Sequence, residues 1–277
     1  MNYPASFPNP FTAARSLAWR EIVRFFRQRN RIVGSIGTPL IFWLLFGTGL
    51  ASSFRLGDGT DGPNFLHYFF PGSLLLLVLF SAIFSSISII EDRREGFLQG
   101  VLVAPIPRWA MVLGKVAGGT LVALVQGLIF LLLALTLPID LRPLAAVQLV
   151  ALLLVAALAI NSLGHIFAWR MDSTQGFHAI MNLVLMPMWL LSGGFFPPPA
   201  WSAGSPLSQQ LLHLAMRANP LSYSVAGVRQ LLSPGLDYRG SWVPDLATCW
   251  IVTLVFALVS FTAAVYVSRQ PAAGDLQ

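Results

Sequence analysis

Six apolar stretches, each about as long as a membrane-spanning helix, constrain the fold of this chain more than any other feature. A helix needs about 20 apolar residues to cross the bilayer core. None of the Asp and Glu residues falls inside these stretches, as expected where each buried charge costs about 3 kcal/mol, and we take the polar residues within them to be neutral. The stretches cover approximately residues 32–54, 68–90, 109–137, 144–169, 177–196 and 246–268. The sequence therefore predicts an all-α integral membrane protein.

Composition agrees with this class and excludes several others. Hydrophobic residues make up 56% of the chain and charged residues 10%, against about 25% charged in soluble domains. The net charge of +6 comes from basic residues beside the apolar stretches, so we expect no nucleic-acid partner. A single cysteine, Cys249, and four scattered histidines provide no disulfide, metal site or catalytic centre.

The basic residues predict the orientation in the membrane. Counting Lys and Arg near the ends of the stretches, we find twelve on the side of the N-terminus. The opposite side has five, namely Arg55, Arg142, Arg217, Arg229 and Arg239. We therefore expect a multi-pass protein of a bacterial plasma (inner) membrane, with both termini in the cytoplasm. The whole chain, 1–277, is then one transmembrane domain, with a cytoplasmic segment at 1–31, a membrane region at 32–268 and a cytoplasmic tail at 269–277.

The residues before the first stretch have an amphipathic helical pattern. Arg20, Arg24, Arg27 and Arg31 form one stripe, and apolar side chains that include Trp19 and Phe26 gather opposite. This predicts an interfacial helix, with its arginines drawn to anionic lipid headgroups. The sequence leaves open whether the helix is only a membrane anchor or transmits motion.

Five consecutive charged residues separate the second stretch from the third. A helix starting near Glu91 would place Glu91 and Asp92 at its positive end, and Pro105 would end it. Its apolar side would be Phe97, Leu98, Val101 and Leu102, with the polar residues largely elsewhere. The predicted element, near residues 91–104, contains Glu91, Asp92, Arg93, Arg94, Glu95, Gly96, Phe97, Leu98, Gln99, Val101 and Leu102. Such a patch suits a docking surface for another protein, and a loop resting on lipid is the alternative.

Residues 197–244 predict interfacial or re-entrant helices on the opposite side. Asn219 and Pro220 give a capped helix start, and the helix would run to Leu232. We interpret this segment, with Tyr223 and with Arg229 near the headgroups, as an outer lid, and an inert pair of interfacial helices as the alternative.

Small and polar residues inside the stretches predict contacts between helices. Gly114 and Gly118 form a G-x-x-x-G step that permits close backbone approach. We expect Gln126, Asn161 and Asn182 to form hydrogen bonds between helices rather than to bind substrate.

Two segments carry a resemblance to a known family. The run Asp92 to Gln99, the continuation LVAPIPRW and the pair Gly114–Lys115 resemble the signature loop of type-2 ABC exporter permeases, although Phe97 stands where threonine is usual and Gly100 loosens the element. Residues 192–232, with SGGFFPPP and then NPLSYSVAGVRQLL, resemble that family's proline-rich exit from the fifth span and the helix that follows it.

The resemblance implies a permease that pairs with a second permease copy, each docking one ATP-hydrolysing subunit. The segment near 91–104 would be the coupling helix, and residues 12–30 the connecting helix. ATP and Mg would bind the partner ATPase, because the only lysine, Lys115, lacks the G-x-x-x-x-G-K-[ST] pattern of a P-loop. This chain would then bind no cofactor and be no enzyme.

The resemblance also indicates a path for the substrate along the first, second and fifth spans. The candidate residues are Phe42, Trp43, Phe46, Phe80, Phe84, Met181, Met188 and Trp189, and contact with lipid or with neighbouring helices is the alternative for each. The apolar spans favour a hydrophobic or amphipathic substrate, such as a drug, a lipid or a lipid-linked glycan. A polysaccharide exporter of the same family stays open. An ATP-independent secondary transporter is less favoured, since it would normally carry a carboxylate within its spans.

Overall fold

The computed structural model describes residues 9–50, 65–137, 139, 142–201, 204–234 and 241–270. Within these ranges it confirms the all-α class: there are ten α-helices, one short 3-10 helix and a single isolated β-bridge between Pro199 and Ser241. The elements are α1 (Pro10–Arg27), α2 (Arg29–Gly49), α3 (Phe65–Arg94), α4 (Phe97–Val103), α5 (Arg108–Leu131), η1 (Leu132–Thr136), α6 (Pro143–Arg170), α7 (Thr174–Leu190), α8 (Leu207–Ala218), α9 (Pro220–Leu232) and α10 (Leu246–Val267). The end of the first predicted span and the predicted C-terminal tail beyond residue 270 lie outside the described residues.

Five helices are long and apolar enough to cross a membrane: α2, α3, α5 with its 3-10 extension, α6 and α10. They coincide with five of the six predicted spans. The remaining prediction, residues 177–196, overlaps α7, which has 17 residues and ends at Leu190. The predicted end at Phe196 is wrong because the chain turns after Leu190, and Gly193 takes a left-handed conformation with φ 75°.

Helix α3 forms the centre of the bundle. Most of its side chains from Phe65 to Ile90 are buried, as expected for a helix that is apolar on every face. Helices α2, α5, α6 and α7 pack around it. The C-terminal end of α3 is therefore positioned by the helices around it.

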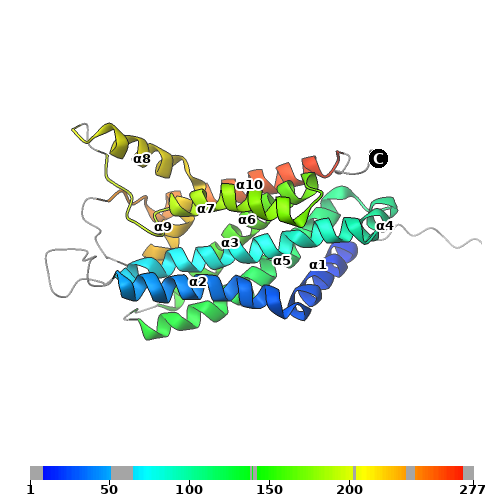
Figure 1. Cartoon of the computed structure of the whole chain (residues 1–277), viewed down its shortest axis with the longest axis horizontal. Coiled ribbons are helices and arrows are strands. Elements are labelled where there is room, and N and C mark those ends of the chain that lie inside the picture. The colour runs from blue at the N-terminus through cyan, green and yellow to red at the C-terminus, as the bar shows by residue number, and fades with distance from the viewer. Residues whose placement is uncertain are drawn as a thin grey trace, which may run out of the picture.

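The short elements gather at the two ends of the bundle (Figure 1). Helices α1 and α4 and the C-terminal end of α10 lie at one end, and α8 and α9 lie at the other. The segments predicted to be cytoplasmic are thus separated from those predicted to form the outer lid by the length of the long helices.

The second lid helix, α9, begins and ends where the sequence predicts. Asn219 caps α9, its side-chain oxygen accepting a hydrogen bond from the Leu221 N–H at 3.1 Å, and α9 ends at Leu232. The Tyr223 hydroxyl donates to the Arg217 carbonyl. The Arg229 side chain is buried: it donates to the Gly193 carbonyl at 2.7 Å and lies over the Tyr68 ring. Its position near the headgroups stays a prediction.

Candidate functional site

The charged run at residues 91–95 lies at the C-terminal end of α3. Glu91 and Asp92 occupy the last turn of this helix, so the prediction of a new helix beginning near Glu91 is wrong. Carboxylates are disfavoured there, because the macrodipole makes the C-terminal end of a helix negative. Cations from elsewhere in the chain must therefore stabilise them.

Arginines of α1 and α2 supply these cations. Arg20 makes two hydrogen bonds to Asp92, at 2.7 and 3.0 Å. Arg24 pairs with Asp92 and reaches Glu91 at 2.9 Å and Glu95 at 3.1 Å, and Arg31 pairs with Glu91. Three of the four arginines expected to face lipid headgroups are thus turned toward carboxylates. Arg27 is exposed.

The most deeply buried part of this cluster joins three helices. The Lys115 ammonium of α5 pairs with Asp92 of α3 and with Glu21 of α1, the latter at 2.6 Å. Their exposed fractions are 7%, 0% and 5%. Lys115 lies inside the third predicted span, so the expectation that polar residues within the spans are neutral is wrong at this position.

The charges of the cluster balance. Its cations are Arg20, Arg24, Arg31 and Lys115, and its carboxylates are Glu21, Glu91, Asp92 and Glu95. Burial by itself would lower the pKa of the Arg20 guanidinium, but the hydrogen bond and the attraction to Asp92 outweigh it, so that this pKa lies above its usual value. The cluster as a whole tolerates a low-dielectric site because every buried charge has a partner of opposite sign.

The two arginines of the run face the other way. Arg93 donates to the carbonyls of Trp169 and Met171, both at 2.9 Å, and Arg94 donates to the Asp172 carbonyl. These carbonyls lie at the end of α6 and just beyond it, where a cation is favourable. The run is charged throughout because its acidic residues bind α1, α2 and α5 while its arginines bind the turn between α6 and α7.

Helix α4 follows directly. Gly96 takes a left-handed conformation with φ 79°, which separates α4 from α3. Leu98 is 2% exposed and packs into the core, and the Arg20 guanidinium lies 3.6 Å from the centre of the Phe97 ring. The exposed face of α4 consists of Gln99, Gly100 and Val103.

The predicted apolar side of α4 and its exposed face consist of different residues. Leu98 is buried, and Phe97, Val101 and Leu102 are half-buried, so the predicted apolar side faces the protein. Val103, 85% exposed, was not among the predicted residues. It could have been found from the pattern, since it follows Gln99 by four positions and therefore shares its face.

Helix α1 packs on α5 through the predicted glycine step. A Cβ atom added at Gly114 would lie 2.7 Å from the Ala14 carbonyl oxygen, and one added at Gly118 would lie 2.6 Å from Glu21 Cβ. The close approach predicted for this step is confirmed, and its partner is α1. Trp19 and Phe26, on the other side of α1, are exposed, as an interfacial helix requires.

The predicted path residues divide into two groups. Trp43, Met181 and Trp189 are buried, and the two indole N–H groups donate to the carbonyls of Leu66 and Gly72, respectively. The half-buried group comprises Phe42, Phe46, Phe80, Phe84 and Met188. Packing between helices accounts for the first group, and the path remains a prediction for the second.

The predicted polar contacts between helices are confirmed at one of three positions. Gln126 donates to the Ser35 hydroxyl, which joins α5 to α2. Asn161 donates to Ala157 in its own helix, and Asn182 lies on the exposed face of α7. Among the described residues, no group of three His, Cys, Asp or Glu side chains could hold a metal ion.

Comparison with known proteins identifies the family. Residues 12–233 match the family model described as ABC-2 type transporter, which is most of the chain. A putative transport permease, ycf38, of Cyanophora paradoxa is 23% identical, over 88% of this chain and 85% of the relative. The inner membrane transport permease YadH of Escherichia coli K12 is 26% identical, over 79% of this chain and 82% of the relative. The chain therefore belongs to the ABC-2 type transporter family, as a transport permease.

Proposed function

We propose that this chain is the membrane-spanning subunit of an ATP-driven exporter of the inner membrane, and that it binds its ATPase through the exposed face of α4. ATP and Mg bind on the ATPase, and a second permease copy completes the transporter. Helix α7 serves as the sixth span, and the end of the bundle that carries α1 and α4 faces the cytoplasm, together with both termini. The family, the five long apolar helices and the relatives named as transport permeases support this proposal.

One observation carries the coupling role: α4 is joined to the membrane helices through the charged cluster. Only two residues separate it from α3, Leu98 anchors it in the core, and Arg20 contacts both Phe97 and Asp92. A displacement of α4 by the ATPase is then transmitted to α3, and through Lys115 and Arg20 to α5 and α1. Since only Gln28 separates α1 from α2, the first span moves with them.

The substrate that we propose is hydrophobic or amphipathic: a drug, a lipid or a lipid-linked glycan. The half-buried aromatic side chains of α2 and α3, such as Phe46 and Phe84, would suit such a molecule, and a polysaccharide is the second candidate within the same family. Ion-driven transport is disfavoured, because the buried carboxylates Glu21 and Asp92 are both held by cations and are not available to bind a transported ion.

The docking face is tested by adding one carboxylate to it. The tagged permease is purified in mild detergent from its native membrane, and the ATPase that co-purifies with it is detected by mass spectrometry. Val103→Asp changes the most exposed apolar side chain of α4 and touches no core contact, so we expect normal expression with loss of the ATPase. Leu98→Asp is unsuitable, because Leu98 is buried and its replacement would disrupt folding.

Gln175→Asp is the matched control. Gln175 is exposed in the first turn of α7, at the same end of the bundle, where a negative charge is favourable for the helix. This variant should retain the ATPase. If Val103→Asp retains the ATPase as well as Gln175→Asp does, α4 is not the docking element.

A further inference from the structure

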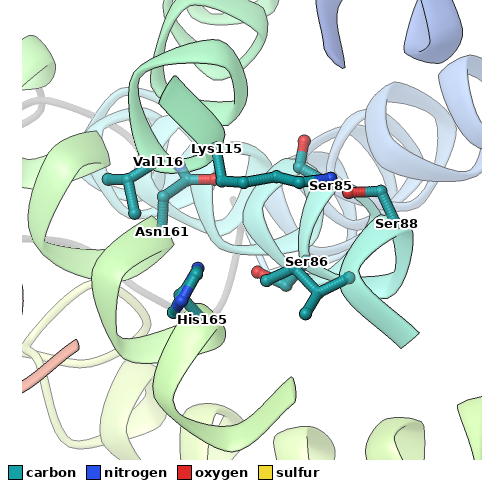
Figure 2. A pocket seen from close by; sticks show the side chains of 8 residues that line it. Ser85, Ser86, Ser88, Lys115, Val116, Asn161 and His165 are labelled. Carbon is teal, nitrogen blue, oxygen red and sulfur yellow. The ribbon is translucent and has the colours of Figure 1, made fainter. Parts of the chain in front are cut away.

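A small polar cavity lies between α3, α5 and α6, next to the charged cluster (Figure 2). Its polar lining comprises Ser85, Ser86, Ser88, Lys115, Asn161 and His165. Counted as space for the centres of water molecules, its volume is about 10 Å³, which is about what one water molecule requires. The cavity lies where three of the long membrane helices meet.

Two polar atoms of this lining lack a protein partner among the described residues. They are Nδ1 of His165 and Oγ of Ser85, and both atoms are buried. The Ser85 hydroxyl is turned away from His165 and Ser85 also lines a second cavity beside α1, whereas the Ser86 hydroxyl is turned toward His165 (Figure 2). The other ring nitrogen of His165, Nε2, lies 2.9 Å from the Ser268 hydroxyl, and the residue is 1% exposed. Buried polar atoms of native proteins nearly always have a partner, which is often an ordered water molecule.

Lys115 contributes a third hydrogen-bonding group to the cavity. An ammonium has three N–H donors, and those of Lys115 reach Glu21 and Asp92, leaving one donor beyond these two acceptors. Because Lys115 also lines the cavity, its third N–H group is placed to donate to a molecule bound there.

We propose that the cavity binds an ordered water molecule that is shared by α3, α5 and α6. Water fits because it can donate and accept, and so can satisfy a serine hydroxyl, an ammonium and either tautomer of His165. A cation is disfavoured by the Lys115 ammonium. An anion is disfavoured because the charge of Lys115 is already neutralised by two carboxylates and the Asn161 amide N–H is directed to Ala157.

The position of this water bears on how the helices move. Directly packed side chains interlock, whereas a water molecule can exchange hydrogen-bond partners when the helices around it shift. The proposed site lies beside Lys115, the residue that joins α1, α3 and α5. The water molecule would therefore supply hydrogen bonds to α6 while α1, α3 and α5 move relative to α6. This inference does not depend on which substrate is transported or on where the ATPase binds.

The test is a structure of the full chain with its partner subunits in lipid nanodiscs, at a resolution that shows ordered water elsewhere in the bundle. We expect one density peak within hydrogen-bonding distance of His165 Nδ1, on the side where Figure 2 shows the Ser86 hydroxyl. A second structure in bromide buffer distinguishes water from an anion, because a peak that becomes stronger in bromide would overturn the proposal. So would an empty cavity at that resolution.

Two variants provide a matched comparison. His165→Phe removes both ring nitrogens, and Ser268→Ala removes only the partner of Nε2 and leaves the cavity lining intact. We expect the peak to be lost in His165→Phe and retained in Ser268→Ala. If His165→Phe does not fold, Ser86→Ala, which deletes the hydroxyl group that Figure 2 shows turned toward His165, takes its place with the same expected loss of the peak. A peak that persists unchanged without these groups would show that they do not bind the water.

Discussion

A single methyl group added at Gly118 should displace α1 from the bundle. The Cβ of Gly118→Ala would lie 2.6 Å from Glu21 Cβ and 2.9 Å from the Ala18 carbonyl oxygen. Carbon atoms in contact are normally about 3.5–4.0 Å apart. Because one of the two obstructing atoms belongs to the backbone of α1, a change of rotamer cannot relieve the overlap, and the helix itself must move by about 1 Å.

The expected cost follows from this displacement. Overpacking of this kind costs about 1–3 kcal/mol. The same movement would lengthen the 2.6 Å contact between Glu21 and Lys115 beyond hydrogen-bonding distance. The higher helix propensity of alanine returns up to about 1 kcal/mol, so we expect a net loss of about 1–2 kcal/mol in the free energy of unfolding.

The detergent-purified protein is heated, and size-exclusion chromatography measures the fraction that stays folded at each temperature. The melting temperature obtained in this way reports the loss of stability. Gly127→Ala is the control in the same helix, since its Cβ would meet only Leu74 Cδ1 at 3.8 Å, an ordinary contact. We expect Gly127→Ala to be neutral or stabilising and Gly118→Ala to melt at a lower temperature. Equal melting temperatures for the two variants would refute the packing of α1 on α5.

Two further changes test the charged cluster and the last helix. Lys115→Met should cost about 3–5 kcal/mol, because it removes the shared partner of two buried carboxylates, and Lys115→Arg should cost less; a Met variant with wild-type yield and melting temperature would contradict the ion pairs. Asp245→Ala should lower the melting temperature by removing the cap of α10, whereas Asp245→Asn should retain most of the cap. The side-chain and backbone hydrogen bonds from Thr248 lower the pKa of Asp245, so the contribution of the ionised cap is present above the ordinary carboxyl pKa and is lost as the pH falls through the lowered value. The difference between wild type and Asp245→Ala should therefore narrow in acid, and a difference that does not change with pH would argue against a charged cap.

The spans were predictable because their signal is local. Hydropathy over about 20 residues identifies α3, α6 and α10 without knowledge of their neighbours, and the Asn219–Pro220 pair identifies the start of α9 for the same reason. The end of α7 was missed because apolar residues continue past Leu190. Hydropathy does not distinguish a helix from an apolar turn.

The charged cluster could not be predicted in the same way. The preference of carboxylates for helix N-termini suggested a helix starting near Glu91, but the partners of Asp92 are Arg20, Arg24 and Lys115, and Arg20 and Arg24 lie about 70 residues away in the sequence. These long-range ion pairs override the local preference of the helix end. The apolar side of α4 was likewise assigned to docking because nothing in the sequence shows that Leu98 is covered by the bundle.

The pair Gly114–Lys115 and the following Gly118 have a common physical explanation in this fold. The glycines allow the backbone of α1 to approach α5, and only at this distance can Glu21 reach the Lys115 ammonium. The same ammonium binds Asp92 in the last turn of α3, and only Glu95 and Gly96 separate α3 from α4. A larger residue at Gly118 and an uncharged residue at Lys115 should therefore have the same mechanical consequence by different routes, since each separates α1 from the end of α3. If α4 receives the force of an ATPase, both variants should weaken the coupling between ATP hydrolysis and transport even under conditions in which the variant protein stays folded, whereas Gly127→Ala should leave it unchanged.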